Sequence, residues 1–132
     1  MRITGLYAAI AALFVVIFAV RVTLRRRAIK VGIGNGGDSV LAQRIRVHAN
    51  AVEYLPLALI LLLILELNQT QPPLLHVFGC LLLLGRLAHA WGLSMSPGVT
   101  PGRGLGIVLT WGTIAAMALL LIWQTLVLWV LT

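Results

Sequence analysis

The stretch RIRVHANAVEYLPLALILLLILEL, residues 44–67, decides the fold of this chain. It is a long apolar run that carries Arg46, Asn50 and Glu53 at helical spacing. At about 100° per residue, the three side chains fall within roughly 60° of one another on one helix face. Charged and amide groups at membrane depth are costly unless they have partners, and they commonly mark a functional site. The stretch therefore predicts a membrane helix with a polar site on one face.

The composition supports a membrane location for the whole chain. Of its 132 residues, 61% are hydrophobic and only 10% are charged, and the mean hydropathy is +1.04. Soluble domains contain about 25% charged residues. The length suits one domain over residues 1–132. We therefore expect an integral membrane protein with a single domain.

Three polar or Gly- and Pro-rich segments divide the apolar sequence into four candidate spans. The segments are VGIGNGGD, NQTQPP and SMSPGVTPGRG, and each spacing between them allows the roughly 20 apolar residues that a span needs. Asp38 or Ser39 can cap the second span. The sequence thus predicts an all-α bundle of four transmembrane helices, over about 3–27, 39–67, 73–92 and 105–131.

The basic residues predict how the helices are oriented. The net charge is +7, but most Lys and Arg residues cluster in 21–30 and 44–46, beside apolar spans. This is the positive-inside pattern of a cytoplasmic loop and does not indicate a nucleic-acid partner. We expect loops 1 and 3 in the cytoplasm, and both termini in the periplasm of a bacterial inner membrane.

A second polar group lies in the third span, where His89 follows Arg86 by one helical turn. Because the second and third helices are antiparallel, Glu53 and Arg86 are expected to meet. One interpretation is an ion pair that only ties two helices together. The other is a site for an anionic ligand, because arginines outnumber carboxylates at this level. No metal site is expected, since the histidines lie at different depths.

Three further residues have simpler interpretations. Cys80 is the single cysteine and lies in an apolar run, so we expect a small packed core residue. Glu66 and His76 flank the uncharged loop NQTQPP and are expected to face water.

The segment RIRVHANAVEYLP at 44–56 resembles the helix-2 signature of the MAPEG family, the membrane-associated proteins of eicosanoid and glutathione metabolism. GRLAHAWG at 85–92 is similar to an arginine-x-x-histidine stretch on helix 3 of prostaglandin E synthases in that family. The size and the four-span layout agree over nearly the whole chain. Compact sequences of this kind resemble the bacterial branch of the family.

The resemblance implies a homotrimer that binds glutathione as a cosubstrate between neighbouring subunits, toward the cytoplasm. Arg103 is similar to the family arginine that stabilises the glutathione thiolate, and is the expected catalytic residue. The family's glutathione-contacting positions match Arg26, Arg46, Asn50, Glu53, Tyr54, Arg86 and His89. The implied activity is a membrane-bound glutathione transferase or peroxidase that acts on apolar electrophiles among the membrane lipids.

One position departs from the family pattern. The eicosanoid enzymes carry a tyrosine on helix 3 where this chain has Leu93. A non-catalytic scaffold or lipid-binding homologue is therefore the alternative to an enzyme. A small cation transporter built around Glu53 is less favoured, because arginines outnumber that glutamate.

Overall fold

A computed structural model describes the backbone of residues 2–96, 98 and 100–131, and their side chains except those of 128–131. Its helices are α1 (Arg2–Ile29), α2 (Ser39–Leu67), α3 (Pro72–Met95) and α4 (Pro101–Leu131). All four are long and apolar enough to cross a membrane. The predicted all-α architecture with four candidate spans is therefore confirmed.

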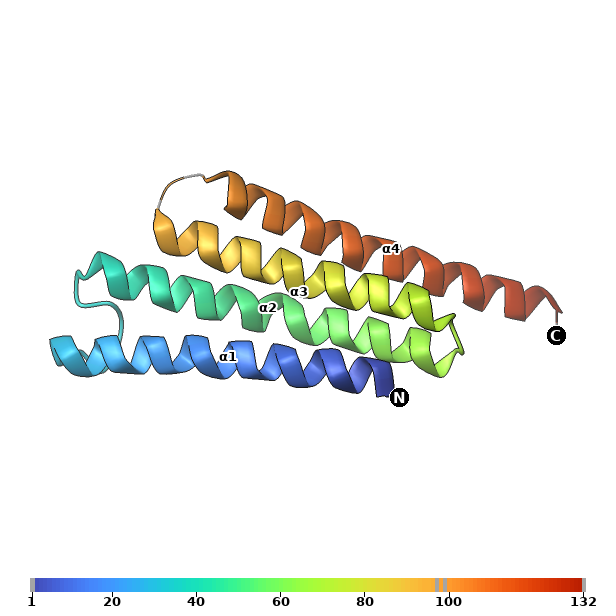
Figure 1. Cartoon of the computed structure of the whole chain (residues 1–132), viewed down its shortest axis with the longest axis horizontal. Helices are drawn as coiled ribbons and strands as arrows, with labels where there is room; N and C mark the ends of the chain where they lie inside the picture. Colours follow the sequence, from blue (N-terminus) through green and yellow to red (C-terminus); the bar gives the residue numbers. More distant parts are fainter. Residues whose placement is uncertain (1, 97, 99, 132) are drawn as a thin grey trace.

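The helices run up and down in a bundle (Figure 1). α1 and α4 lie on opposite sides, with α2 and α3 between them, and α3 and α4 share the most extensive contact. The start of α1 and the end of α4 lie at one end of the bundle, while the loops that follow α1 and α3 lie at the other. We call the end with these two loops the loop end.

α2 begins and ends where the sequence predicts. The Asp38 carboxylate accepts a hydrogen bond from the Leu41 backbone N–H at 2.6 Å, which caps the first turn. At the other end, the Asn68 N–H donates to the Ile64 carbonyl at 2.9 Å. Pro56 lies inside the helix. It lacks an N–H, so one carbonyl of the preceding turn has no intrahelical partner there.

α3 and α4 are longer than expected. α3 continues to Met95, because Gly92 does not end the helix but lies against α4, where a Cβ would come within 2.4 Å of the Arg103 nitrogen. α4 begins at Pro101 and not at Leu105. Proline is suited to a first helical position, and the Thr100 hydroxyl accepts from the Arg103 N–H at 3.3 Å. The Pro- and Gly-rich segment thus contains the first turn of α4.

The centre of the bundle is packed with leucines, and its polar members gather toward the loop end. Leu41, Leu62 and Leu82 are fully buried. Of the six buried polar side chains among the described residues, four lie toward this end and come from three helices: Asn50, Arg86, His89 and Thr110. Many large apolar side chains of α1 and α4 are exposed instead, as expected for surfaces that face lipid or another subunit.

Candidate functional site

Arg86 lies at the centre of the polar cluster and connects three helices. It is only 3% exposed. Its Nε donates to the Thr110 hydroxyl at 2.9 Å, and its Nη2 donates to the Gly106 carbonyl at 3.3 Å, both on α4. Its Nη1 donates to the Asn50 side-chain oxygen on α2. The guanidinium also lies over the Tyr54 ring, with its carbon 5.4 Å from the ring centroid.

Glycines on α3 and α4 make this arrangement possible. A Cβ on Gly106 would lie 2.4 Å from the His89 nitrogen and 2.5 Å from the Gly85 carbonyl oxygen. Such close backbone approach through small residues is a common way for membrane helices to associate. It brings the Gly106 carbonyl and the Thr110 hydroxyl within reach of Arg86.

The expected ion pair between Glu53 and Arg86 does not form. Glu53 instead bonds Arg46, seven residues earlier on the same helix, with an N–O distance of 3.2 Å. Asn50 takes the place of the carboxylate beside Arg86. The reason is angular: Asn50 lies roughly 60° around α2 from Glu53, so the amide faces α3 and the carboxylate does not.

Among the described residues, the groups that solvate the buried charge of Arg86 are neutral. Within the described part of the chain, no carboxylate oxygen lies within 4.0 Å of its guanidinium. Arg46 and Glu53 have side-chain exposures of 57% and 46%. The interior of the site is thus positive, and its outer edge carries an exposed ion pair.

His89 lies within this positive region. It is buried, and its ring makes no hydrogen bond to any described residue. Three guanidinium groups lie near enough to act electrostatically on the ring, those of Arg86, Arg103 and Arg46. Arginines on α2, α3 and α4 thus all contribute positive potential at His89.

Two of the predicted residues bond backbone carbonyls of the loops and not the groups around Arg86. Arg103 is in the first turn of α4, not in the loop as expected, and its Nη1 donates to the Gly98 carbonyl at 3.5 Å. Arg26 donates from Nη1 to the Gly32 and Gly34 carbonyls at 3.1 and 2.9 Å. Within one chain, Arg26 therefore stabilises the first loop and does not contact the cluster.

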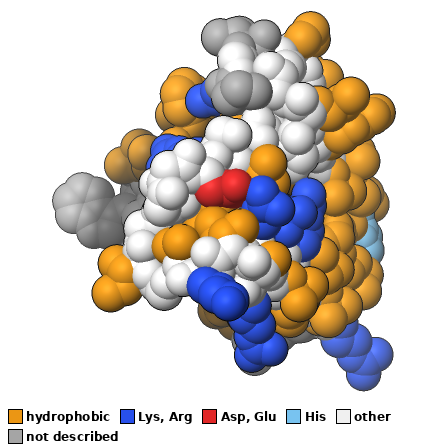
Figure 2. Space-filling model, turned by 90° about the vertical axis from the view of Figure 1, so that its left-hand side faces the viewer, with side chains coloured by type: hydrophobic (Ala, Val, Ile, Leu, Met, Phe, Trp, Pro, Cys, Tyr) orange, Lys and Arg blue, Asp and Glu red, His pale blue; other side chains and the backbone are white. Residues whose placement is uncertain are grey.

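The loop end as a whole is basic. All the Lys and Arg residues except Arg2 lie in the half of the bundle nearer this end. Figure 2 shows several basic side chains on the surface of this end, with an acidic side chain beside them. Asp38 is bonded by Arg25, with N–O distances of 3.1 and 2.6 Å. The Arg25 guanidinium, together with the Leu41 N–H, lowers the pKa of the Asp38 carboxyl.

A profile of the MAPEG family matches residues 4–123 of the chain. The chain belongs to the MAPEG family. It is also 36% identical over 121 residues to the inner membrane protein YecN of Escherichia coli strain K12, which covers 92% of this chain and 91% of that protein. The YecN protein of Escherichia coli O6:H1 matches to the same extent. The resemblance noted from the helix-2 and helix-3 segments is thus confirmed at the level of the family.

The departure of this MAPEG chain at Leu93 is also clear in the structure. Leu93 is only 4% exposed and belongs to the apolar core. It lies one turn beyond His89 on α3. Its side chain therefore packs in the interior and supplies no hydroxyl to the site.

Two partners of Arg86 were missing from the sequence prediction. Thr110 and Gly106 lie four residues apart on α4, and the Thr110 hydroxyl also donates to the Gly106 carbonyl at 2.8 Å. A glycine and a threonine one turn apart in an apolar span indicate a close helix contact. That spacing was the available signal. The spacing does not indicate which residue of the facing helix lies opposite, so it could not identify Arg86 as the partner.

Three residues toward the opposite end make contacts that the sequence did not predict. Cys80 is exposed and not packed in the core, and its sulfur lies 3.2 Å from the Tyr7 hydroxyl. His76 is exposed as expected, but its Nδ1 also contacts that hydroxyl at 3.0 Å. Glu66 is partly buried and accepts hydrogen bonds from the first turn of α1, from the Thr4 N–H at 2.9 Å. It ties α2 to α1 instead of simply facing water.

Proposed function

We propose that this MAPEG protein is a glutathione-dependent transferase or peroxidase that activates a thiol for attack on apolar electrophiles in the membrane. The observation that carries the proposal is the buried guanidinium of Arg86, whose described partners are all neutral. A buried charge without a counterion is costly. A nearby anionic ligand reduces that cost, and glutathione carries two carboxylates and an ionisable thiol.

The exposed pair on α2 supplies the groups for such a ligand. We propose that Arg46 binds a glutathione carboxylate and that Glu53 accepts a hydrogen bond from its amino group. Both side chains are exposed in a single chain, although they lie within a candidate membrane span. Charged side chains within a membrane span are costly unless protein or ligand shields them from lipid. This supports a homotrimer in which a neighbouring subunit closes the site.

We assign different roles to the other predicted residues. All three guanidinium nitrogens of Arg86 donate hydrogen bonds to protein groups. We therefore propose that Arg86 acts on the ligand through its charge and that it holds Asn50 in place. His89 and Tyr54 line the same region. Arg103 is proposed to stabilise the thiolate, and Arg26 is proposed to act on the site of a neighbouring subunit.

The proposed chemistry follows from charge. A guanidinium near sulfur favours the thiolate, and each unit by which the thiol pKa falls corresponds to about 1.4 kcal/mol. The thiolate sulfur forms a bond to the electrophilic carbon, and the leaving group departs with the bonding electrons. With an aryl halide, the products are a thioether and a halide ion.

An activity assay tests the proposal. Purified protein in detergent is mixed with glutathione and an aryl halide, and thioether formation is followed by absorbance. We expect activity in the wild type and a loss of at least tenfold in Arg103→Gln. Arg27→Gln is the matched control, because Arg27 is exposed and its side chain makes no hydrogen bond or ion pair to a described residue. A wild type without activity above the uncatalysed rate would overturn the proposed catalysis.

A non-catalytic scaffold is the second candidate, and the buried Leu93 favours it. The two candidates differ in the assay, because a scaffold forms the oligomer without thiol-dependent activity. A cation transporter is not supported, since Glu53 is already paired with Arg46.

The location of the protein is also a proposal. YecN is named an inner membrane protein, and we infer the same membrane for this chain. The basic loop end is proposed to face the cytoplasm. A reporter fused to the C-terminus, active only in the periplasm, tests that orientation.

A further inference from the structure

A small pocket opens at the loop end, separate from the polar cluster. It has a volume of about 200 Å³ and is formed by α1, α2 and the end of α3. Its lining residues are Arg21, Val40, Gln43, Arg44 and Ser94. None of them is among the residues assigned above to glutathione. Two guanidinium groups and an amide thus surround one small hollow.

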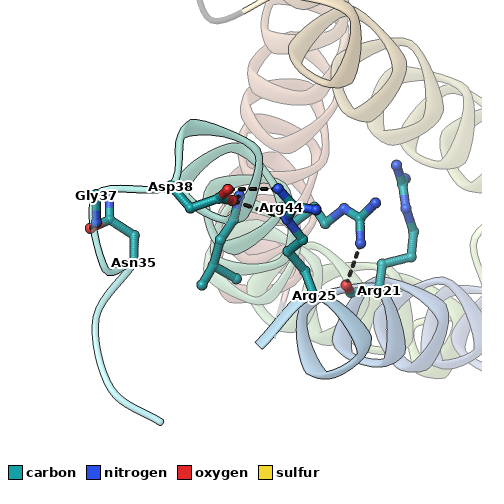
Figure 3. A network of polar contacts seen from close by, with 7 residues as sticks. Arg21, Arg25, Asn35, Gly37, Asp38 and Arg44 are labelled. Carbon is teal, nitrogen blue, oxygen red and sulfur yellow. Dashed lines mark hydrogen bonds and ion pairs between the residues drawn. The ribbon is translucent and has the colours of Figure 1, made fainter. Parts of the chain in front are cut away.

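The two arginines retain donors that no protein group uses. Arg44 donates from Nη1 to the Arg21 backbone carbonyl at 2.9 Å, which fixes its guanidinium against α1 (Figure 3). Its Nε and Nη2 make no hydrogen bond to a described residue, and neither does the side chain of Arg21. The Ser94 hydroxyl already donates to the Ala90 carbonyl, so it can take part in the pocket only as a hydrogen-bond acceptor.

The nearest acidic group does not neutralise the pocket. The positive charge of Arg44 acts electrostatically on Asp38. However, both carboxylate oxygens of Asp38 accept hydrogen bonds from Arg25, and one of them also caps α2. Figure 3 shows the Arg25–Asp38 pair beside Arg21 and Arg44. Two guanidinium charges therefore remain for a ligand. A fixed, bidentate donor group is well suited to phosphate.

The depth of Arg21 favours a lipid as the source of that phosphate. The preceding stretch 3–20 carries no charged residue and spans roughly 27 Å as a helix at 1.5 Å per residue. This is close to the thickness of the hydrocarbon core, about 30 Å. Arg21 therefore lies where the hydrocarbon ends and headgroups begin. Ile17 and Val20 next to it are exposed and can contact acyl chains.

We propose that this pocket binds the phosphate group of an anionic phospholipid, with Arg21 and Arg44 as donors and Gln43 as a further polar contact. Basic pockets between membrane helices near the cytoplasmic side are suited to such headgroups. The site is independent of glutathione binding. It ties the lipid to the junction of α1, α2 and α3.

Native mass spectrometry of the detergent-solubilised protein tests this site. The titrants are dioctanoyl phosphatidylglycerol, dioctanoyl phosphatidylcholine and inorganic phosphate. We expect phosphatidylglycerol to bind at least tenfold more tightly than either of the others. In the double variant Arg21→Gln/Arg44→Gln, its affinity is expected to fall roughly thirtyfold, since each basic residue near an anionic surface contributes about fivefold.

A charge-matched control separates a built site from diffuse attraction. Arg27→Gln/Lys30→Gln removes the same charge from exposed residues outside the pocket. We expect it to lower the affinity by no more than about fivefold, because unspecific attraction is screened by salt. The single variant Arg21→Gln removes a side chain without a described hydrogen bond, so it gives a folded protein if the double variant does not.

Each outcome decides the proposal. Loss of phosphatidylglycerol binding in the pocket variants, with binding retained in the control variant, supports it. Equal losses in the two double variants would overturn it, since the attraction would then depend on net charge alone. Binding of inorganic phosphate as tight as that of the lipid would overturn the assignment to a phospholipid.

Discussion

Asn50 on α2 accepts a hydrogen bond from the buried guanidinium of Arg86 on α3, and this bond takes the place of an ion pair. It joins the two helices without neutralising the arginine. Because Thr110 and Gly106 on α4 complete the shell with neutral groups, the centre of the bundle keeps a net positive charge. The site proposed for glutathione depends on that charge.

Asn50→Ala should destabilise the protein, because it leaves a buried N–H of Arg86 without an acceptor. The expected cost is about 1–3 kcal/mol in the free energy of unfolding. Thermal unfolding in detergent measures it as a lower melting temperature. Asn68→Ala is the control, since the exposed Asn68 side chain bonds Gln124 across the surface and its backbone bond to Ile64 is kept by alanine. Equal losses in both variants would contradict the role given to Asn50.

Thr110→Val should also destabilise, although valine has nearly the same shape as threonine. The change removes the acceptor for Arg86 Nε, and a loss of about 1–3 kcal/mol is expected. Thr113→Val is a close comparison on the same helix, because the Thr113 hydroxyl bonds only the carbonyl of Leu109 in its own helix. We expect that variant to unfold within about 0.5 kcal/mol of the wild type. A larger loss of stability in Thr113→Val than in Thr110→Val would show that the bond to Arg86 is dispensable.

Gly106→Ala should separate α3 from α4. The new Cβ would meet backbone atoms of His89 and Gly85 at 2.4 and 2.5 Å, so the helices must shift. We expect about 1–3 kcal/mol of lost stability, and weaker ligand binding as well. At Gly112 an added Cβ meets nothing within 4 Å. Gly112→Ala should therefore unfold at or above the wild-type temperature, and a similar loss there would argue against the close contact.

The Asp38 carboxyl should make stability fall in acid. Its pKa in the folded protein is lowered by the Arg25 guanidinium and by the Leu41 N–H. A group whose pKa is lower in the folded than in the unfolded protein stabilises the fold at pH values above its unfolded pKa, here about 3.9. This stabilisation is lost as the pH falls through the folded pKa. Asp38→Asn keeps a capping side chain but cannot ionise. The melting temperatures of wild type and variant should differ at pH 7 and converge below pH 4, whereas a constant gap would count against the pair.

The fold was predictable from the sequence because apolar span length and polar linkers are local features. α2 was placed correctly because Asp38 is a strong cap and the apolar run ends in a polar loop. The end of α3 and the start of α4 were not, because Gly92 lies in a helix contact and Pro101 in a first turn. Their usual meaning as helix breakers was therefore misleading.

The sequence identified the residues of the site better than it identified which of them bond to one another. Spacing placed Asn50 and Glu53 on one side of α2, but it could not decide which of them faces Arg86. That choice depends on the rotation of α2 against α3, which packing of leucines and glycines sets. Cys80 shows the same limit, since an apolar neighbourhood in sequence left its exposure on α3 undetermined.

Equilibrium binding of glutathione to the purified protein, measured by titration calorimetry in detergent, tests the central claim most directly. The account predicts saturable binding to the wild type, at least tenfold weaker binding to Arg46→Gln, and unchanged binding to Arg27→Gln. A tenfold loss corresponds to about 1.4 kcal/mol, close to the lower end of the range of about 1.5–3 kcal/mol for a hydrogen bond to a charged group. The same affinity in all three proteins, or no binding to the wild type, would contradict it.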